Sequence, residues 1–248
     1  MYAPPAGVHD EMLGPDGQAR PHWRAFLDTF ATLSPEDLAQ RWELGQNLLR
    51  DNGVTYNIHG DPEGLERPWT LDPLPLLLPA AEWDWIARAV AQRAGLLNEV
   101  MADLYGKRNL IALGLIPPAL LHANPSFLRP CHGWMPAGGH HLHIYGADLV
   151  RGADGCWRVL ADRTESPAGA GYALENRTIV NRILPEQSRS AHIARLGPFF
   201  EALRRSLLQL SPRRTDSPRV VLLTPGPYNE TYFEHAFLAR HLGLTLAQ

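Results

Sequence analysis

The feature that most constrains the fold of this chain is a continuously apolar run near its C-terminus. Residues 219–224 read Arg-Val-Val-Leu-Leu-Thr, a pattern typical of a strand buried on both faces. A loop over 225–229 and a helix over about 230–242 follow, which indicates the opening of a parallel α/β sheet. A single strand–helix unit cannot cover such a sheet, although 244–247 offers a second strand. We therefore expect the chain to be cut in mid-domain, or to be completed by a partner.

Composition places the chain among soluble globular proteins. Of its 248 residues, 45% are hydrophobic and 20% are charged, which supplies a core and excludes a generally disordered chain. Lys+Arg total 23 against 26 for Asp+Glu, a net charge of −3, so we expect no nucleic-acid binding through bulk positive charge. We expect neither a signal peptide nor a membrane span, because no segment has the required apolar pattern. Two cysteines without metal or disulfide spacing favour the reducing cytoplasm.

Residues 1–130 are predicted to form a mostly helical region. Ser34-Pro35-Glu36-Asp37 is a strong helix start, because serine caps, proline fits the first turn and the acids suit the positive end of the helix dipole. That helix should end by Asn52-Gly53, and a long helix is predicted over about 80–105, closed by Gly106. The other predicted elements here are a helix around 23–33, a short strand over 54–59, a turn over 60–64 and an extended proline-rich segment over 68–79.

After residue 130 alternating apolar and polar residues predict strands. Runs over 141–150 and 156–162 are joined by Asp154-Gly155, a strong hairpin signal. A loop leads to a third predicted strand, Tyr172–Ile179, so residues 131–185 are expected to form an antiparallel meander. A helix over about 198–210 and the C-terminal strand–helix unit make up a third region, 186–248. The predicted fold class is therefore α+β, ending in the start of a Rossmann-like α/β unit.

The densest polar stretch of the chain, Leu160–Arg177, suggests a metal site. Asp162 ends one predicted strand, while Glu175 and Asn176 lie on the next. Pairing of these strands would bring Asp162 and Glu175 together at one end of a sheet, whereas adjacent strand residues such as Glu175 and Asn176 face opposite ways. Carboxylate and amide oxygens are hard ligands that suit Mg²⁺ bridging phosphate groups.

The same stretch carries groups suited to phosphate. Arg163 and Arg177 could neutralise phosphates through bidentate contacts. The loop from Ser166 to Gly171, which includes Gly169, could present backbone N–H groups to an anion. The alternative is a surface hairpin with a network of Asp–Arg and Glu–Arg ion pairs, because structural ion pairs of this kind are common.

Two further groups of residues are candidate sites. Asn229, in the loop after the apolar strand, lies where open α/β sheets bind ligands, but it could equally cap the helix that follows. His140, His141 and His143 cluster without a cysteine or carboxylate at a zinc spacing, which favours ordinary strand histidines.

Seven short segments, in a fixed order, carry a resemblance to a known family. They are Pro21-His22-Trp23, Asn52-Gly53-Val54-Thr55-Tyr56, Gly60-Asp61-Pro62, Glu82-Trp83, Phe127-Leu128-Arg129-Pro130, Gly169–Arg177 and Leu223–His235. Together they resemble the circularly permuted ATP-grasp proteins, relatives of glutathionylspermidine synthase. The likeness runs from about Asp10 to the last residue, and it is most specific over 174–177 and 228–235.

The resemblance implies an ATP-dependent carboxylate–amine ligase with ATP and Mg²⁺ as cofactors. An acyl phosphate forms on a carboxylate, and an amine then displaces phosphate to give an amide, while Mg²⁺ and cationic side chains stabilise phosphoryl transfer. It implies Asp162, Glu175 and Asn176 as metal ligands. The substrates would be a small-molecule or peptide carboxylate and an amine, and a homo-oligomer stays open.

The resemblance also implies that this chain lacks a part that other members of the family have. Family members continue for roughly as long again, and the remainder carries lysines that hold ATP phosphates. Lys107 is the only lysine in this chain, and it lies far in sequence from Asp162. We therefore expect the chain to be an N-terminal portion that is inactive by itself. The alternative is a non-catalytic binding or assembly module that keeps the fold without the chemistry.

Overall fold

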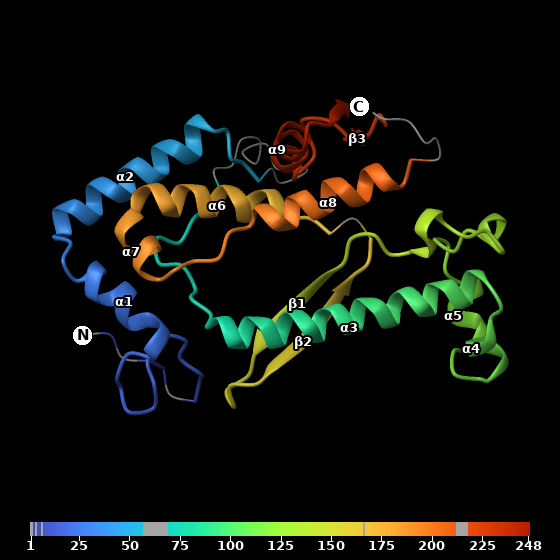
Figure 1. Cartoon of the computed structure of the whole chain (residues 1–248), viewed down its shortest axis with the longest axis horizontal. Coiled ribbons are helices and arrows are strands. Elements are labelled where there is room, and N and C mark those ends of the chain that lie inside the picture. Colours follow the sequence, from blue (N-terminus) through green and yellow to red (C-terminus); the bar gives the residue numbers. More distant parts are fainter. Residues whose placement is uncertain (1, 3, 6, 57–68, 166, 212–217) are drawn as a thin grey trace.

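The computed structural model describes residues 2, 4–5, 7–56, 69–165, 167–211 and 218–248. Its helices are α1 (Pro21–Phe30), α2 (Pro35–Asp51), α3 (Ala80–Tyr105), α4 (Asn109–Ala112), α5 (Pro118–His122), α6 (Ala170–Ile183), α7 (Pro185–Ser190), α8 (Gly197–Gln209) and α9 (Tyr232–Leu242). Its strands are β1 (Gly146–Arg151), β2 (Trp157–Arg163), β3 (Val221–Leu223) and β4 (Thr245–Ala247). Helix α3 and the hairpin of β1 and β2 lie along one side of the molecule, and α2, α6, α8 and α9 lie along the other (Figure 1).

Helix α2 begins and ends where the sequence predicts. The Ser34 hydroxyl accepts a hydrogen bond from the Asp37 backbone N–H at 3.1 Å, and the Asp37 carboxylate accepts one from the Ser34 backbone N–H at 3.1 Å. These reciprocal bonds form a capping box, which satisfies amides that the helix itself leaves unpaired. At the other end Gly53, with a φ of 65°, turns the chain out of the helix.

Replacing Ser34 by alanine should lower the free energy of unfolding by about 1 kcal/mol, because the capping hydrogen bond is lost from a helix that is otherwise intact. Ser34→Gly should cost much less, since glycine leaves the same amide open to water. Urea denaturation of both variants measures the difference. Equal stability of the wild type and Ser34→Ala would show that the cap contributes nothing.

Helix α3 confirms the long helix predicted over about 80–105, and it ends at Gly106 as expected. Beyond it, short helical turns form one end of the molecule, where the His141 ring stacks on Tyr105 with ring centroids 6.0 Å apart. The described residues hold no group of three or more histidine, cysteine, aspartate or glutamate side chains suited to a metal ion, His140, His141 and His143 included. No helix within the described ranges combines the length and apolar character needed to cross a membrane.

Strands β1 and β2 confirm the predicted hairpin, although both begin later than expected. They pair antiparallel from Gly146 opposite Arg163 to Arg151 opposite Trp157, and the register shifts after Asp148. Such a bulge leaves one residue unpaired and bends the strand. A two-stranded hairpin is marginal by itself, so its position depends on what it packs against.

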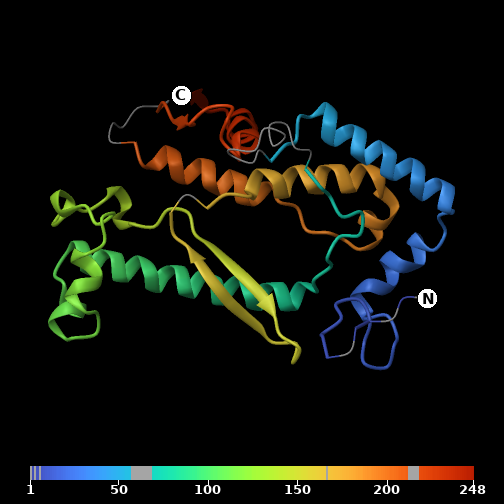
Figure 2. The ribbon, with the colours of Figure 1, turned by 180° about the vertical axis from the view of Figure 1, so that it is seen from behind.

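The hairpin lies across α3 and is attached to it at two places (Figure 2). In the first turn of α3, Glu82 accepts hydrogen bonds from Arg151 and Trp157 of the hairpin. Further along α3, Arg93 donates two hydrogen bonds of 2.6 Å to the Asp162 carboxylate. Between these attachments, mainly apolar side chains of α3 and the hairpin line an open groove of about 650 Å³. We call these two contacts the hairpin attachments.

The third predicted strand is wrong, because residues Tyr172–Ile179 lie inside helix α6. Tyr172, Glu175, Ile179 and Ile183 are all buried, and they recur at the spacing of one helix face. The helix starts after Gly169, whose φ of 113° suits glycine. The predicted antiparallel meander is therefore reduced to the β1–β2 hairpin.

The C-terminal segment forms a parallel strand pair joined by a helix. Val221 to Leu223 of β3 lie opposite Thr245 to Ala247 of β4, and α9 connects them. The strand, the helix and the second short strand predicted from the sequence are confirmed, but β3 is not buried on both faces, because Val221 is 42% and Leu223 76% exposed. Gly243, at a φ of 69°, ends α9 and lets the chain turn directly into β4.

Helix α6 is central to the packing, since it contributes to both hydrophobic clusters of the described core. One cluster includes Tyr172, Ile179 and Val180 of α6 together with Leu49, Val54, Leu71, Phe233 and Phe237. The other joins Ile183 and Leu184 to Trp23, Phe26 and Leu77. Thus α6 links the N-terminal helices to α9, and burial of these side chains fixes its position.

Candidate functional site

Two polar side chains of α6 meet residues from a distant part of the chain. Asn52, directly after α2, donates a hydrogen bond of 2.5 Å from Nδ2 to Oε1 of Glu175, which is only 6% exposed. The Trp69 indole N–H donates one of 2.9 Å to Oδ1 of the neighbouring Asn176. Both predicted metal ligands on α6 therefore accept a hydrogen bond from this chain. We call the surroundings of these side chains the α6 cluster.

Tyr172 extends the α6 cluster by one turn towards the start of the helix. Its hydroxyl donates a hydrogen bond of 2.7 Å to the Thr55 backbone carbonyl, and its ring stacks on Trp69 with centroids 4.4 Å apart. Burial, with a smaller contribution from the Glu234 carboxylate, raises the pKa of Tyr172 to about 12. The phenol is therefore a protonated donor at neutral pH.

The N-terminus of α6 binds a carboxylate that belongs to the same chain. Glu234 of α9, 2% exposed, accepts hydrogen bonds from the Gly169 backbone N–H at 2.7 and 2.8 Å and from the Gly171 N–H at 2.7 Å. The glycine-rich loop does present N–H groups to an anion, as its sequence suggests, but the anion in this structure is the Glu234 side chain. A negative charge at this position is stabilised by the helix dipole and by the amides. Glu234 was not among the predicted site residues.

The loop between β3 and α9 is ordered by its own side chains. Asn229 Oδ1 accepts hydrogen bonds from the backbone N–H and the hydroxyl of Thr231 at 3.0 and 2.9 Å, so it stabilises the turn that enters α9. Thr224 Oγ1 accepts from the Gly226 N–H and lies 3.0 Å from His235 Nδ1. Asn229 therefore does not cap α9 itself, because the N-cap residue is Thr231, whose side chain makes no cap hydrogen bond, and the role of Asn229 as a ligand contact stays a prediction.

The predicted site residues Asp162 and Arg163 lie on the hairpin, with partners of their own. Asp162 accepts from Arg93 and, at 2.5 Å, from the Tyr145 hydroxyl. The Arg93 guanidinium, and after it the Tyr145 hydroxyl, lower the pKa of Asp162 to about 2. Arg163 pairs with Asp148 of β1 at 2.6 Å. These contacts agree with the Asp–Arg part of the ion-pair network that is the alternative interpretation of this stretch, whereas Glu175 accepts a hydrogen bond from Asn52.

Removing the Asp162 charge should destabilise the protein in a pH-dependent way. Because the folded-state pKa of Asp162 lies below its ordinary value, the carboxylate stabilises the fold above about pH 4, and that stabilisation is lost as the pH falls towards about 2. The difference in unfolding free energy between wild type and Asp162→Asn should therefore shrink between pH 6 and pH 3 in urea titrations. The same trend should be weaker in an Arg93→Gln background, in which the Tyr145 hydroxyl still binds the carboxylate. A difference that does not change with pH would contradict the role of this pair.

The three predicted metal ligands lie on two different elements, and their role as Mg²⁺ ligands stays a prediction. Asp162 is held on the hairpin by Arg93, while Glu175 and Asn176 are held on α6 by different donors. Neighbouring residues of a helix project about 100° apart, so the Glu175 and Asn176 side chains point in different directions.

The remaining predicted phosphate contacts are also placed separately. Arg177 donates a hydrogen bond of 2.8 Å to the Ala194 carbonyl, and burial lowers the pKa of its guanidinium. Ser166 lies outside the described residues, as does the predicted turn over 60–64. Four of the predicted site residues belong to helix α6 or its N-cap: Gly169, Glu175, Asn176 and Arg177. A fifth, Asn229, lies near the start of α9, which packs on α6.

Three segments of the family resemblance thus meet around α6, from the region after α2, from α6 itself and from α9. The family model of the circularly permuted ATP-grasp proteins of type 2 matches residues 75–248 of this mixed α+β chain. The chain therefore belongs to that family. The chain is 36% identical, over 244 residues, to an uncharacterized protein of Synechocystis sp., and 35% identical, over 252 residues, to an uncharacterized protein of Mycobacterium tuberculosis. A Frankia alni protein named "Putative glutamate--cysteine ligase 2-3" is 36% identical over 247 residues.

The matched relatives are longer than this chain. Each of the three alignments covers 98% of the chain, but only 51% of the Synechocystis protein and 28% of the Mycobacterium and Frankia proteins. The chain therefore spans about half of the length of one relative and less of the others.

Proposed function

We propose that this chain is part of an ATP-dependent carboxylate–amine ligase that forms an amide through an acyl phosphate. The observation that carries the proposal is the match of the family model to residues 75–248, because ATP-grasp ligases in general use Mg-ATP to activate a carboxylate. The printed name of the Frankia relative, a ligase that joins glutamate to cysteine, supports the same class of reaction. In this proposal the chain is the N-terminal portion of the ligase, and β3, α9 and β4 begin a Rossmann-like subdomain.

Within that reaction the described residues act first as a scaffold. Glu234 fixes the start of α6 against α9, and Asn52 and Trp69 fix Glu175 and Asn176. Asp162, on the hairpin, and Glu175 and Asn176, on α6, are proposed as metal ligands, and Arg163, Arg177, Ser166, Gly169 and Asn229 are proposed as phosphate contacts.

The second candidate function is a non-catalytic binding or assembly module. It is favoured by a specific observation: the carboxylates and the amide predicted to bind metal each accept a hydrogen bond from this chain, as expected for residues that only stabilise the fold.

Phosphate release by the full-length protein distinguishes the two candidates. With Mg-ATP, and with glutamate and cysteine as the first substrates, a ligase releases phosphate only when both a carboxylate and an amine are present. Glu175→Gln should reduce that release at least about tenfold while the variant remains folded, and Glu201→Gln on the exposed face of α8 is the matched control. ATP binding without substrate-dependent phosphate release across a panel of carboxylates and amines would support the module instead.

A further inference from the structure

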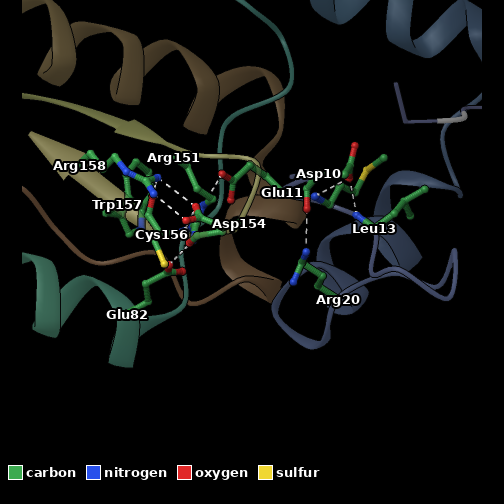
Figure 3. A network of polar contacts seen from close by, with 12 residues as sticks. Asp10, Glu11, Leu13, Arg20, Glu82, Arg151, Asp154, Cys156, Trp157 and Arg158 are labelled. Atoms are coloured by element: carbon green, nitrogen blue, oxygen red, sulfur yellow. Dashed lines mark hydrogen bonds and ion pairs between the residues drawn. The ribbon is translucent and has the colours of Figure 1, made fainter. Parts of the chain in front are cut away.

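A second polar site lies outside the α6 cluster, where the N-terminal loop, the start of α1, the start of α3 and the end of β1 meet. A cavity of about 380 Å³ opens there, lined by two prolines and by three pairs of polar residues: His9 and His22, Glu11 and Glu82, Arg20 and Arg151. Its volume falls at the lower end of the range of about 300–1,000 Å³ typical of small-molecule sites. Figure 3 shows most of the charged side chains at this junction.

The acidic side of the cavity is fixed in place by Arg151. This guanidinium donates from Nε to Glu11 Oε1 at 2.6 Å and from Nη1 to Glu82 Oε1 at 2.5 Å. Among the described residues, the second carboxylate oxygen of each glutamate has no hydrogen-bond donor. The two carboxylates share one guanidinium, so the pair keeps a net negative charge and a free accepting oxygen on each acid.

Arg20 gives the cavity a basic side. Its Nε donates a hydrogen bond of 2.9 Å to the Asp10 carbonyl, which fixes the direction of the side chain (Figure 3). Within the described ranges, neither Nη atom of Arg20 takes part in a hydrogen bond or ion pair. Because a guanidinium binds a carboxylate with two parallel hydrogen bonds, this end suits an anionic group.

The His22 ring also lines this cavity. Its Nε2 is buried and has no hydrogen-bond partner among the described residues. Burial lowers the pKa of the ring, which also forms a hydrogen bond with the backbone of Leu77. The ring is therefore neutral at neutral pH, and with the other nitrogen used, Nε2 carries a lone pair that lacks a donor.

We propose that this cavity binds an α-amino acid as its zwitterion, with the carboxylate on Arg20 and the ammonium shared by Glu82 and Glu11, beside the neutral ring of His22. The ligand supplies each group that the lining lacks: an anion for a guanidinium with free N–H groups, and N–H donors for two carboxylates. Neither a simple anion nor a simple cation satisfies both sides. The site is separate from the proposed ligase chemistry, and it needs neither ATP nor a metal.

Calorimetric titration of the purified chain with L-alanine and with L-glutamate, in the absence of nucleotide, tests this proposal. Both should bind, whereas acetate and methylamine, which each carry only one of the two charged groups, should bind at least about tenfold more weakly. Arg20→Gln should weaken amino-acid binding by about tenfold or more. Arg24→Gln, an exposed arginine of α1 outside the cavity, is the matched control and should bind as the wild type does.

A second measurement on the wild-type protein covers the case in which Arg20→Gln does not fold. The imidazole nitrogen resonances of His22, assigned by their loss in His22→Gln, should shift when L-alanine is added and should not shift with acetate. Absence of heat and of any His22 shift with both amino acids would overturn the proposal. So would binding that Arg20→Gln leaves unchanged in a folded variant.

Discussion

Replacing Glu234 by alanine is expected to lower the free energy of unfolding by about 3–5 kcal/mol, because the substitution removes a buried charge from its donors. The carboxylate is almost fully buried and accepts three hydrogen bonds from the Gly169 and Gly171 amides. Without it, those amides stay buried and unpaired, and a cavity opens between α6 and α9. Chemical denaturation, followed by far-ultraviolet circular dichroism, measures the change.

Two further variants separate charge from packing at this position. Glu234→Gln keeps one accepting oxygen and most of the volume, so it should cost about 1–2 kcal/mol. Glu201→Ala, on the exposed face of α8, should change stability by less than about 0.5 kcal/mol. If Glu234→Ala were as stable as Glu201→Ala, the carboxylate would not be what holds α6 in place.

Replacing Arg151 by methionine should cost about 2–4 kcal/mol, somewhat less than a fully buried ion pair, because its partners are partly open to water. The side chain is 10% exposed and holds Glu11 and Glu82 together, while its guanidinium lies 4.3 Å from the centre of the Trp157 ring. Methionine keeps the contact with the ring but leaves two carboxylates facing each other without a cation. Urea denaturation at neutral pH is the direct measurement.

The matched control for Arg151 lies on the same hairpin. Arg158 pairs with Asp154, but both side chains are more than half exposed, so Arg158→Met should alter stability by less than about 0.5 kcal/mol. The loss of stability in Arg151→Lys should be intermediate, since a lysine ammonium lacks the planar, forked arrangement of N–H donors with which the guanidinium binds two carboxylates. Equal effects of Arg151→Met and Arg158→Met would mean that the buried position of Arg151 has no special role.

Elements whose boundaries are set by neighbouring residues could be predicted from the sequence. The cap of α2 lies within Ser34–Asp37, the end of α3 is marked by Gly106, and the hairpin turn is marked by Asp154-Gly155, so short-range patterns were sufficient. The apolar run of β3 was equally clear, because a strand of that kind has few alternatives.

Helix α6 could not be predicted in the same way, because a distant residue fixes where it begins. Gly169, the residue before the helix, has no side chain with which to cap it; the carboxylate that binds the first amides comes from Glu234, more than sixty residues later. The third strand was predicted from alternation that also fits one face of a helix. Once that element is helical, Asp162 and Glu175 no longer lie on paired strands, and the predicted metal site loses its geometric basis.

The hydrogen-bond partners of the predicted site residues could not be predicted from the sequence, for a related reason. Glu175 and Asn176 were recognised as polar residues of a specific segment, but Asn52 and Trp69 reach them only through tertiary packing. Arg93 carries no local signal, since it is one of many arginines on helix surfaces. Glu234 lies in one of the segments that carry the family resemblance. It stands between aromatic residues of α9, and this position in the sequence indicates that its carboxylate is buried and needs a partner.

The two hairpin attachments also set a limit on how the chain can change in length. Glu82 and Arg93 are eleven residues apart, about 16 Å along a helix, and Trp157 and Asp162 are five residues apart, about 16 Å along a strand. The two contacts are therefore separated by the same distance along the helix and along the strand, although the number of residues between them differs. One residue added to α3 between its two contacts would rotate Arg93 by about 100° and detach Asp162, whereas the turn joining β1 to β2 lies outside that span. Insertions should therefore be tolerated far better at the tip of the hairpin than in the helix beneath it.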